Sequence, residues 1–307
     1  MSSDTSKNAS SASNNASTIA VIANTKKIAK KEIDQLRRNL TAAGLDSACW
    51  HVIERGSDAK PKAAKAVKRG AQTVIVCGGD GTVRAAAEAL VGTSAALAVV
   101  PAGTANLFAS GLHLPSDIEE IVDLVARGDR RSIDTAECNG QTFNVMAGSG
   151  FDVGMLAQAE ADKSQMGMVA YLRAGMSEVR DRKLFDTKIT IDGDDFFDGE
   201  ASCVLVGKIG ASKAGFETFP EATPTDGKLH VAVVTAHGVR EWAGLMASAV
   251  LHRQHRSDHA QLGEGCEVKV SFDGKRRFEL DGGVKGKAKR LDFAVRPHSQ
   301  IVCAPAA

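Results

Sequence analysis

The sequence predicts an α/β N-terminal domain with a mostly parallel sheet, then a second, largely antiparallel β domain, with the active-site cleft between them. Three observations lead to this fold class. Apolar strand-like runs alternate with helical patterns up to about residue 130, as in parallel sheets covered by helices. Short β segments separated by turn residues follow. Glycine-rich turns at residues 78–82 and 101–106 come directly after buried strands.

Each element of the first domain has its own pattern. Residues 26–43 carry apolar side chains at helical spacing and end at Gly44. Gly70 and Gly128 end two further helical patterns in the same way. The expected strands are residues 18–23, 48–53, 74–77 and 96–100, and the expected helices are residues 26–43, 59–69, 83–90 and 117–127.

The second domain begins with a hairpin signal. Residues 131–137 and 142–147 alternate in β fashion around Asn139-Gly140, a pair that favours a two-residue hairpin turn. Residues 151–180 have a helical pattern, and residues 239–251 form a further expected helix. The remaining expected strands are residues 187–191, 201–206, 229–235, 268–272, 277–280, 291–295 and 301–303.

Composition excludes several classes of function. The 38 Lys and Arg against 37 Asp and Glu give a formal net charge of +1, and aromatic residues make up 5%, so we expect no nucleic-acid partner. Six dispersed cysteines without a C-x-x-C pair indicate free thiols in a reducing cytoplasm. We expect residues 1–17, rich in Ser, Asn and Ala, to be a disordered tail rather than a signal peptide or an anchor.

The turn at residues 78–82, Gly-Gly-Asp-Gly-Thr, carries the first chemical signal. Glycine lets backbone N–H groups approach an anion, and the N-terminus of the following helix attracts negative charge. Asp80 places a carboxylate among the backbone N–H groups that would bind phosphate, and this suggests metal binding or proton transfer. At the carboxyl ends of strands in an open α/β sheet, the two glycine turns are expected to meet in a ligand-binding crevice. The pattern favours phosphoryl transfer.

Several motifs in order resemble the diacylglycerol kinase catalytic domain family, which includes bacterial lipid kinases and sphingosine kinases and is distantly related to NAD kinases. The resemblance covers nearly everything from residue 18 to the C-terminus. The motifs are Gly78-Gly79-Asp80-Gly81-Thr82, Pro101-x-Gly103-Thr104-x-Asn106, Leu112-x-Leu114-Pro115, the segment 144–152, Pro220-x-Ala222 with Asp226-Gly227-x-Leu229, and Asp281-Gly282.

This resemblance implies an ATP- and Mg²⁺-dependent kinase that phosphorylates a lipid hydroxyl, diacylglycerol-like or sphingoid. Asp80 matches the central acidic residue, and Asp134 a position that joins it in a magnesium–water network. Asp281 matches the candidate general base. The loop from Asp226 to Leu229 matches a second, structural magnesium site of bacterial members. The positions that match nucleotide contacts are Asn24, Thr25, Gly78, Gly79, Gly81, Thr82, Gly103, Thr104 and Asn106.

Three positions depart from the family pattern. The first loop reads Asn24-Thr25-Lys26-Lys27 instead of Asn-Pro-x-Ser/Gly. Leu107 stands where bacterial members often have Asp, and Gly283 replaces the glutamate of the common Asp-Gly-Glu. The missing carboxylate either shifts the metal and proton roles onto Asp281 and Asp80 or leaves a weakened enzyme.

Simpler interpretations exist for some of these residues. Asp281-Gly282 and Asp226-Gly227 are also ordinary hairpin turns, and Asp134 is also a common capping or solvated residue. The basic residues Arg253, Arg256, Lys285, Lys287, Lys289 and Arg290 either meet anionic lipid headgroups or form a solvated surface. Two rival functions remain: an NAD kinase, and a nucleotide- or lipid-binding homologue with weakened catalysis.

We therefore expect a lipid kinase that is cytoplasmic and peripheral at the inner membrane face, with a lipid substrate as its partner and a homodimer left open. The expected division is a tail at 1–17, a nucleotide-binding α/β domain at 18–130, a β-rich domain at 131–290, and a C-terminal segment at 291–307 that returns to the first domain.

Overall fold

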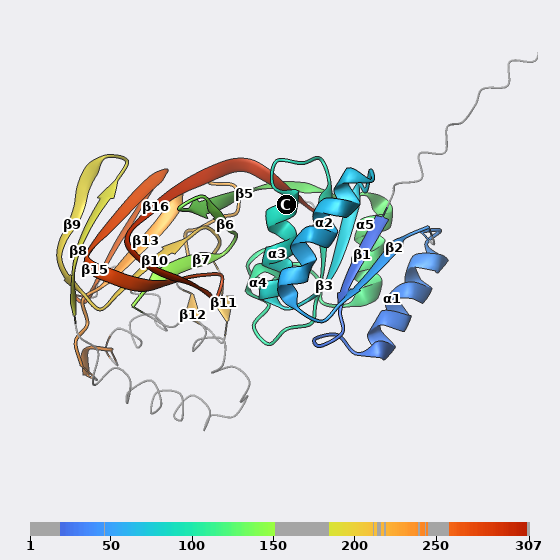
Figure 1. The fold of residues 1–307 in the computed structure, drawn as a ribbon, viewed down its shortest axis with the longest axis horizontal. Helices are drawn as coiled ribbons and strands as arrows, with labels where there is room; N and C mark the ends of the chain where they lie inside the picture. Colours follow the sequence, from blue (N-terminus) through green and yellow to red (C-terminus); the bar gives the residue numbers. More distant parts are fainter. Residues whose placement is uncertain are drawn as a thin grey trace, which may run out of the picture.

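The computed structural model describes residues 19–45, 47–150, 184–210, 212–213, 216–217, 219–238, 240–242, 244 and 258–305. The expected tail at 1–17 and helical segment at 151–180 lie outside the described residues, as do Arg253, Arg256 and most of the expected helix at 239–251. The described residues form an α/β lobe and a β lobe that lie side by side (Figure 1). None of their helices has both the length and the apolar character that a membrane crossing needs.

A parallel sheet with helices on both faces forms the α/β lobe, in the strand order β4-β3-β1-β2. Alternate strand residues point to opposite faces, so α2 and α3 cover one apolar face while α1 and α5 cover the other. Its elements are β1 (Ile19–Asn24), α1 (Lys30–Ala42), β2 (Cys49–Ile53), the 3₁₀ turn η1 (Gly56–Asp58), α2 (Ala59–Lys68), β3 (Thr73–Gly78), α3 (Asp80–Leu90), β4 (Ala96–Pro101), α4 (Leu107–Gly111) and α5 (Ile118–Arg127).

Two helices of this lobe start at least three residues away from the expected position. Helix α1 begins at Lys30 instead of residue 26, because the N–H groups of Lys27 and Ile28 both donate to the Asn24 carbonyl and form a turn first. Helix α3 begins at Asp80 instead of residue 83, since Thr82 and Val83 donate to the Gly79 carbonyl. The Asp-Gly-Thr segment therefore forms the first turn of a helix.

The β lobe is largely antiparallel, as expected, and the predicted fold class is confirmed. Long strands β15 and β16 pair with each other, and β7, β10, β13 and β14 follow on one side. Strands β8 and β9 branch from β15, while β5 and β6 branch from β16. The strands are β5 (Arg131–Cys138), β6 (Gln141–Phe143), β7 (Met146–Ser149), β8 (Phe185–Ile191), β9 (Asp194–Ala201), β10 (Cys203–Gly207), β11 (Ser212–Lys213), β12 (Phe216–Glu217), β13 (Leu229–Val234), β14 (Ala260–Gly265), β15 (Glu267–Leu280) and β16 (Gly283–Val302).

The hairpin expected around Asn139-Gly140 is present but its second arm is divided. Strand β6 pairs with β5, whereas β7 pairs with β10 and β15. The division has a local cause. The N–H groups of Asn144, Val145 and Met146 all donate to the Asp281 carboxylate, so they do not pair with strand β5.

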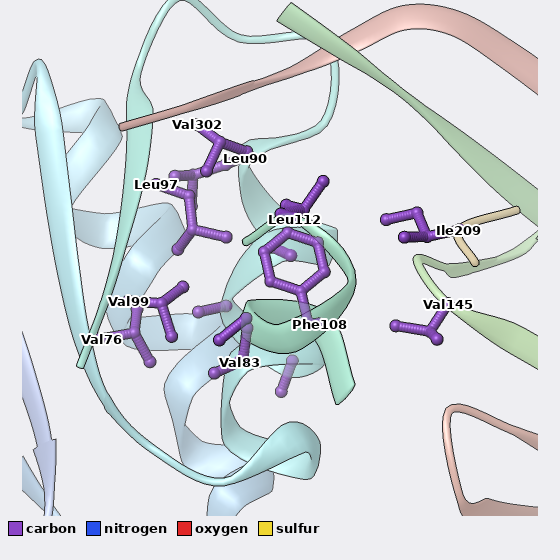
Figure 2. Packing of buried hydrophobic residues seen from close by; sticks show 14 of the residues in the cluster. Val76, Val83, Leu90, Leu97, Val99, Phe108, Leu112, Val145, Ile209 and Val302 are labelled. Atoms are coloured by element: carbon purple, nitrogen blue, oxygen red, sulfur yellow. The ribbon is translucent and has the colours of Figure 1, made fainter. Parts of the chain in front are cut away.

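The last strand joins the two lobes. Strand β16 runs from the β lobe into the α/β lobe (Figure 1), where Ile301 and Val302 pair in parallel with Ala96 and Leu97 of β4. In Figure 2, Phe108 and Leu112 of the α/β lobe face Val145 and Ile209 of the β lobe within one apolar cluster. One sheet path therefore runs through both lobes, and the division at residues 130 and 131 stays a prediction.

Candidate active site

The candidate site begins where the order of the parallel strands reverses. The chain passes from β1 to β2 on one side and then returns to place β3 on the other side of β1. Ligands of open α/β sheets bind in the crevice at such a point, beyond the carboxyl ends of the strands. Asn24 at the end of β1 donates from its side-chain nitrogen to the Thr82 hydroxyl over 3.0 Å and so ties β1 to the first turn of α3.

The two glycine turns are packed backbone against backbone. A Cβ atom on Gly103 would lie 2.5 Å from Gly79 Cα, and one on Gly78 would lie 2.7 Å from Thr82 Cβ. The N–H of Ala102 donates to the Gly78 carbonyl over 2.9 Å. Gly79 and Gly103 are therefore required for the approach of the two turns, whereas Gly78 is required for the first turn to fold against its own Thr82. Gly81 differs, because a Cβ there would meet no atom within 4 Å and faces open space.

Side chains from both turns fix the loop geometry. Asp80 Oδ1 accepts from the N–H of Phe108 over 3.3 Å, which links the start of α3 to α4. Asn106 has a left-handed φ of 49°, and its side chain both accepts from the Gly103 N–H over 2.8 Å and donates to the Gly103 carbonyl over 3.0 Å. The structure thus brings Asn24, Gly78, Gly79, Asp80, Gly81, Thr82, Gly103 and Asn106 together. Thr25 and Thr104 are exposed beside them.

Asp281 forms a hairpin turn with Gly282 between β15 and β16. Both residues have positive φ, 46° and 72°, as a two-residue type I′ turn requires. The buried carboxylate accepts three backbone N–H bonds, two on Oδ1 from Val145 and Met146 and one on Oδ2 from Asn144. A carboxylate has about four acceptor positions, so within the described residues Oδ2 keeps one for a ligand.

Burial raises the pKa of Asp281 above its usual range, and the N–H bonds and the charge of Arg84 oppose this effect without cancelling it. Arg84 lies on α3, one turn after Asp80, so Asp281 faces the helix that begins with the glycine turn. Lys285 lies near both residues, and burial together with the charge of Arg84 lowers its pKa. Two cations therefore stand beside the candidate base.

A magnesium ion fits at Asp80. Magnesium in kinase sites is held by one or two carboxylates together with substrate phosphates and water. Asp80 offers such a carboxylate at the N-terminus of an eleven-residue helix, beside the glycine backbone where phosphates would lie. No group of three or more His, Cys, Asp or Glu side chains that could hold a metal occurs among the described residues, so phosphate and water would supply most ligands of a magnesium ion at Asp80.

A second magnesium ion does not fit at the loop from Asp226 to Leu229. The Asp226 carboxylate already accepts four bonds, from Lys208 Nζ (2.7 Å), the Lys228 N–H (2.9 Å), the Thr223 N–H (2.8 Å) and His230 Nε2 (2.9 Å). Asp134 is buried and lies 3.2 Å from the same lysine. Asp134 and Asp226 thus meet around an ammonium group, and Leu229 is a buried residue of β13.

Sequence reasoning missed three residues of these clusters. Lys208 stands between Gly207 and Ile209, directly after an apolar strand. A lysine in such an apolar context is the sequence signal that could have identified it. Arg84 stands one helical turn after Asp80, a spacing that places both at the same end of α3. Asn144 is buried, and its side-chain nitrogen and oxygen have no hydrogen-bond partner among the described residues. Asn144 is the first residue of the motif at residues 144–152, but no role in the site was predicted for it.

Comparison with known families agrees with this geometry. The family model described as the diacylglycerol kinase catalytic domain matches residues 18–138. A second model, the YegS C-terminal NAD kinase beta sandwich-like domain, matches residues 145–303. The chain is 30% identical to a diacylglycerol kinase of Bacillus subtilis over 267 residues, which are 85% of this chain and 87% of the relative. It is 29% identical over 238 residues to the uncharacterised protein sll0036 of Synechocystis, covering 76% of this chain and about half, 54%, of that relative.

Solved structures share the fold. A diacylglycerol kinase from Bacillus anthracis Sterne superposes with a TM-score of 0.70 at 19% identity, over 94% of this chain and 97% of the other. An NAD kinase from Archaeoglobus fulgidus in complex with ATP superposes with a TM-score of 0.54 at 10% identity, over 93% of each chain. The expected resemblance and fold are therefore confirmed.

Proposed function

Since this chain belongs to the diacylglycerol kinase catalytic domain family, we propose that it is an ATP-dependent lipid kinase that transfers the γ-phosphate to a lipid hydroxyl. One observation carries the proposal. The two glycine turns pack against each other at the switch point of the sheet, with Asp80 at the start of α3 and Asp281 facing the same helix.

The nucleotide phosphates lie along the glycine turns. The N-terminus of α3 supplies backbone N–H groups and a positive dipole end, and Gly81 leaves open space in front of it. Magnesium, when bound, neutralises phosphate charge beside Asp80. Positioning and charge neutralisation account for most of the catalysis of phosphoryl transfer, and this half of the site provides both.

Asp281 is the general base of the proposal. Its carboxylate takes the proton of the lipid hydroxyl, the hydroxyl oxygen bonds to the γ-phosphorus, and the bond from that phosphorus to the β–γ bridging oxygen breaks to release ADP. Burial raises the pKa of Asp281 and thereby makes the carboxylate a stronger base. Arg84 and Lys285 stand where they would stabilise negative charge on the transferred group.

Gly283 favours a second candidate, a homologue with weakened catalysis. The position has space, because a Cβ on Gly283 would lie 3.4 Å from the Leu280 carbonyl oxygen, an ordinary contact. Packing would therefore allow a glutamate at position 283. Substitution Gly283→Glu separates the candidates: a large gain in turnover would identify the natural chain as the weakened form.

The β15–β16 hairpin is the proposed contact with the membrane. Arg277 lies directly opposite Lys287, although like charges in this position destabilise a sheet. Both side chains and those of Lys275 and Lys289 are exposed, and none forms an ion pair with another described residue. Val284, 56% exposed, follows the Asp281 turn on the same hairpin. Anionic headgroups would neutralise these charges and place lipid next to the candidate base.

The acceptor assay tests the proposed function. Purified protein is incubated with γ-labelled ATP, magnesium and either a mixed lipid extract or NAD, and products are identified by mass spectrometry. We expect labelled lipid and no labelled NADP. Labelled NADP alone would establish the rival NAD kinase, and ATP binding without transfer to any acceptor would establish the non-catalytic homologue.

Vesicle binding tests the hairpin contact. We expect Arg277→Glu/Lys287→Glu to lose binding to phosphatidylglycerol vesicles, while its binding to phosphatidylcholine vesicles does not change.

A further inference from the structure

We infer that the Lys208 ammonium group is a built-in cation that takes the place of a divalent metal ion between Asp134 and Asp226, so that removing Lys208 opens a metal site there. This inference goes beyond the proposed function, since it concerns a cluster in the β lobe that shares no residue with the Asp80 and Asp281 site.

The surroundings of Lys208 Nζ consist of oxygen atoms. The side chain is fully buried, and its nitrogen lies 2.7 Å from Asp226 Oδ1, 2.9 Å from the Thr223 carbonyl oxygen and 3.2 Å from Asp134 Oδ2. Lys208 therefore donates hydrogen bonds to Asp226 and Thr223 and forms an ion pair with Asp134. Two carboxylates and one backbone carbonyl are also a ligand set that magnesium and calcium use in proteins.

The cluster connects three segments that are distant in sequence. Asp134 belongs to β5, Lys208 follows β10, and Asp226 belongs to the loop before β13. The N–H of Gly227 donates to Asp134 Oδ2, and the N–H of Asp134 donates to the Pro224 carbonyl, each over 2.8 Å. The lysine therefore fastens the loop before β13 to β5, which is the mechanical role of a structural metal.

Loss of the ammonium group would remove the cation that lies 3.2 Å from Asp134 and 2.7 Å from Asp226. Asp134 is 1% exposed, and buried carboxylates without a cation are strongly destabilising. A variant with a short neutral side chain would leave Asp134 and Asp226 facing each other with space between them. A divalent cation would match both the charge and the oxygen donors, whereas a side chain that fills the space would exclude it.

Thermal unfolding in the absence of nucleotide provides the test. The chain is compared with Lys208→Ala, which opens the space, and with the matched control Lys208→Met, which fills it without charge. Melting temperatures are measured in EDTA and across a series of MgCl₂ or CaCl₂ concentrations. We expect the natural chain to melt at the same temperature in EDTA and in magnesium, and both variants to melt about 5–10 °C lower in EDTA.

Divalent ions should restore at least half of that loss in Lys208→Ala and none of it in Lys208→Met. They should also fail to restore Lys208→Ala/Asp226→Asn, which lacks one carboxylate. A lower melting temperature of the natural chain in EDTA, or a Lys208→Ala protein that divalent ions do not stabilise, would overturn the inference. If Lys208→Ala does not fold under any condition, the inference is tested by whether the natural chain melts at the same temperature in EDTA and in magnesium. None of these readouts depends on kinase activity, so they stand apart from the acceptor assay.

Discussion

Asp281 is at once a turn residue and the candidate base. Its left-handed backbone is one that Asp tolerates better than most residues, and its carboxylate holds the three N–H groups that divide the hairpin at residues 144–146. The interpretation as an ordinary hairpin turn and the catalytic interpretation therefore describe the same geometry. What separates them is whether the carboxylate titrates in the reaction.

The pH dependence of turnover makes that distinction. The carboxylate must be ionised to accept a proton, and burial raises its pKa above the ordinary 3.8, so kcat/KM should rise with pH through a midpoint above that value. The Arg84 charge lowers the pKa of Asp281, so Arg84→Gln should move this midpoint to higher pH. A profile whose acidic limb is unchanged in Arg84→Gln would contradict the assignment of Asp281 as the base.

At the scale of elements, the strand–turn–helix units β3–α3 and β4–α4 make the nucleotide half of the site. Their contact depends on missing side chains, since Gly79 and Gly103 approach each other through bare backbone. The left-handed Asn106 then closes the second turn on Gly103. Gly79, Gly103 and Asn106 thus each have a steric or hydrogen-bonding reason for their place in the motifs.

A matched pair of alanine substitutions tests this account of the turns. Gly103→Ala places a Cβ 2.5 Å from Gly79 Cα and should destabilise the fold by about 1–3 kcal/mol while weakening ATP binding. Gly81→Ala meets no atom within 4 Å and should leave the melting temperature unchanged, yet weaken ATP binding because it fills the ligand's space. Calorimetric titration with ATP and thermal unfolding measure both effects. Equal ATP affinity in Gly81→Ala and the natural chain would contradict the placement of the phosphates.

Sequence patterns predicted strands β1 to β4 and helices α1, α2, α3 and α5 of the α/β lobe, because the strands are largely apolar and glycines end α1, α2 and α5. The short helix α4 was not predicted. The patterns failed where tertiary contacts override local signals. Asp273-Gly274 has the composition of a turn but forms an irregularity within the continuous strand β15. Strand β9 (DDFFDGEA) was missed because it is polar, and it is defined only by its pairing with β8. Similarly, Lys208 became visible only through the partners that the fold brings to it.

At the scale of the whole molecule, strand β16 holds the two lobes together. It forms the Asp281 hairpin at its start, crosses to the α/β lobe, and ends beside β4 with Val302 fully buried. The base and the glycine turns lie on different lobes, so the geometry of the site depends on this connection. Figure 2 shows Val302 next to Leu90 and Leu97 in the shared cluster.

Two valines on this strand provide a matched comparison. Val302→Ala removes two buried methyl groups and should lower the free energy of unfolding by about 2 kcal/mol, because the methyl groups lose their transfer energy and leave a cavity. Val284→Ala, at a position 56% exposed, should change it by less than about 0.5 kcal/mol. Urea denaturation measures both. Equal effects would show that the end of β16 does not stabilise the junction.

The most direct test of the central claim is phosphoryl transfer by Asp80→Ala. Asp80 is the one carboxylate of the glycine turn, whereas Asp123, exposed on α5, provides a control substitution of the same type. Label transfer from γ-labelled ATP to a lipid extract is measured for the natural chain, Asp80→Ala and Asp123→Ala, together with their melting temperatures. We predict labelled lipid from the natural chain and from Asp123→Ala, and none from a folded Asp80→Ala. Full transfer by Asp80→Ala would contradict the assignment of this turn as the phosphoryl-transfer site.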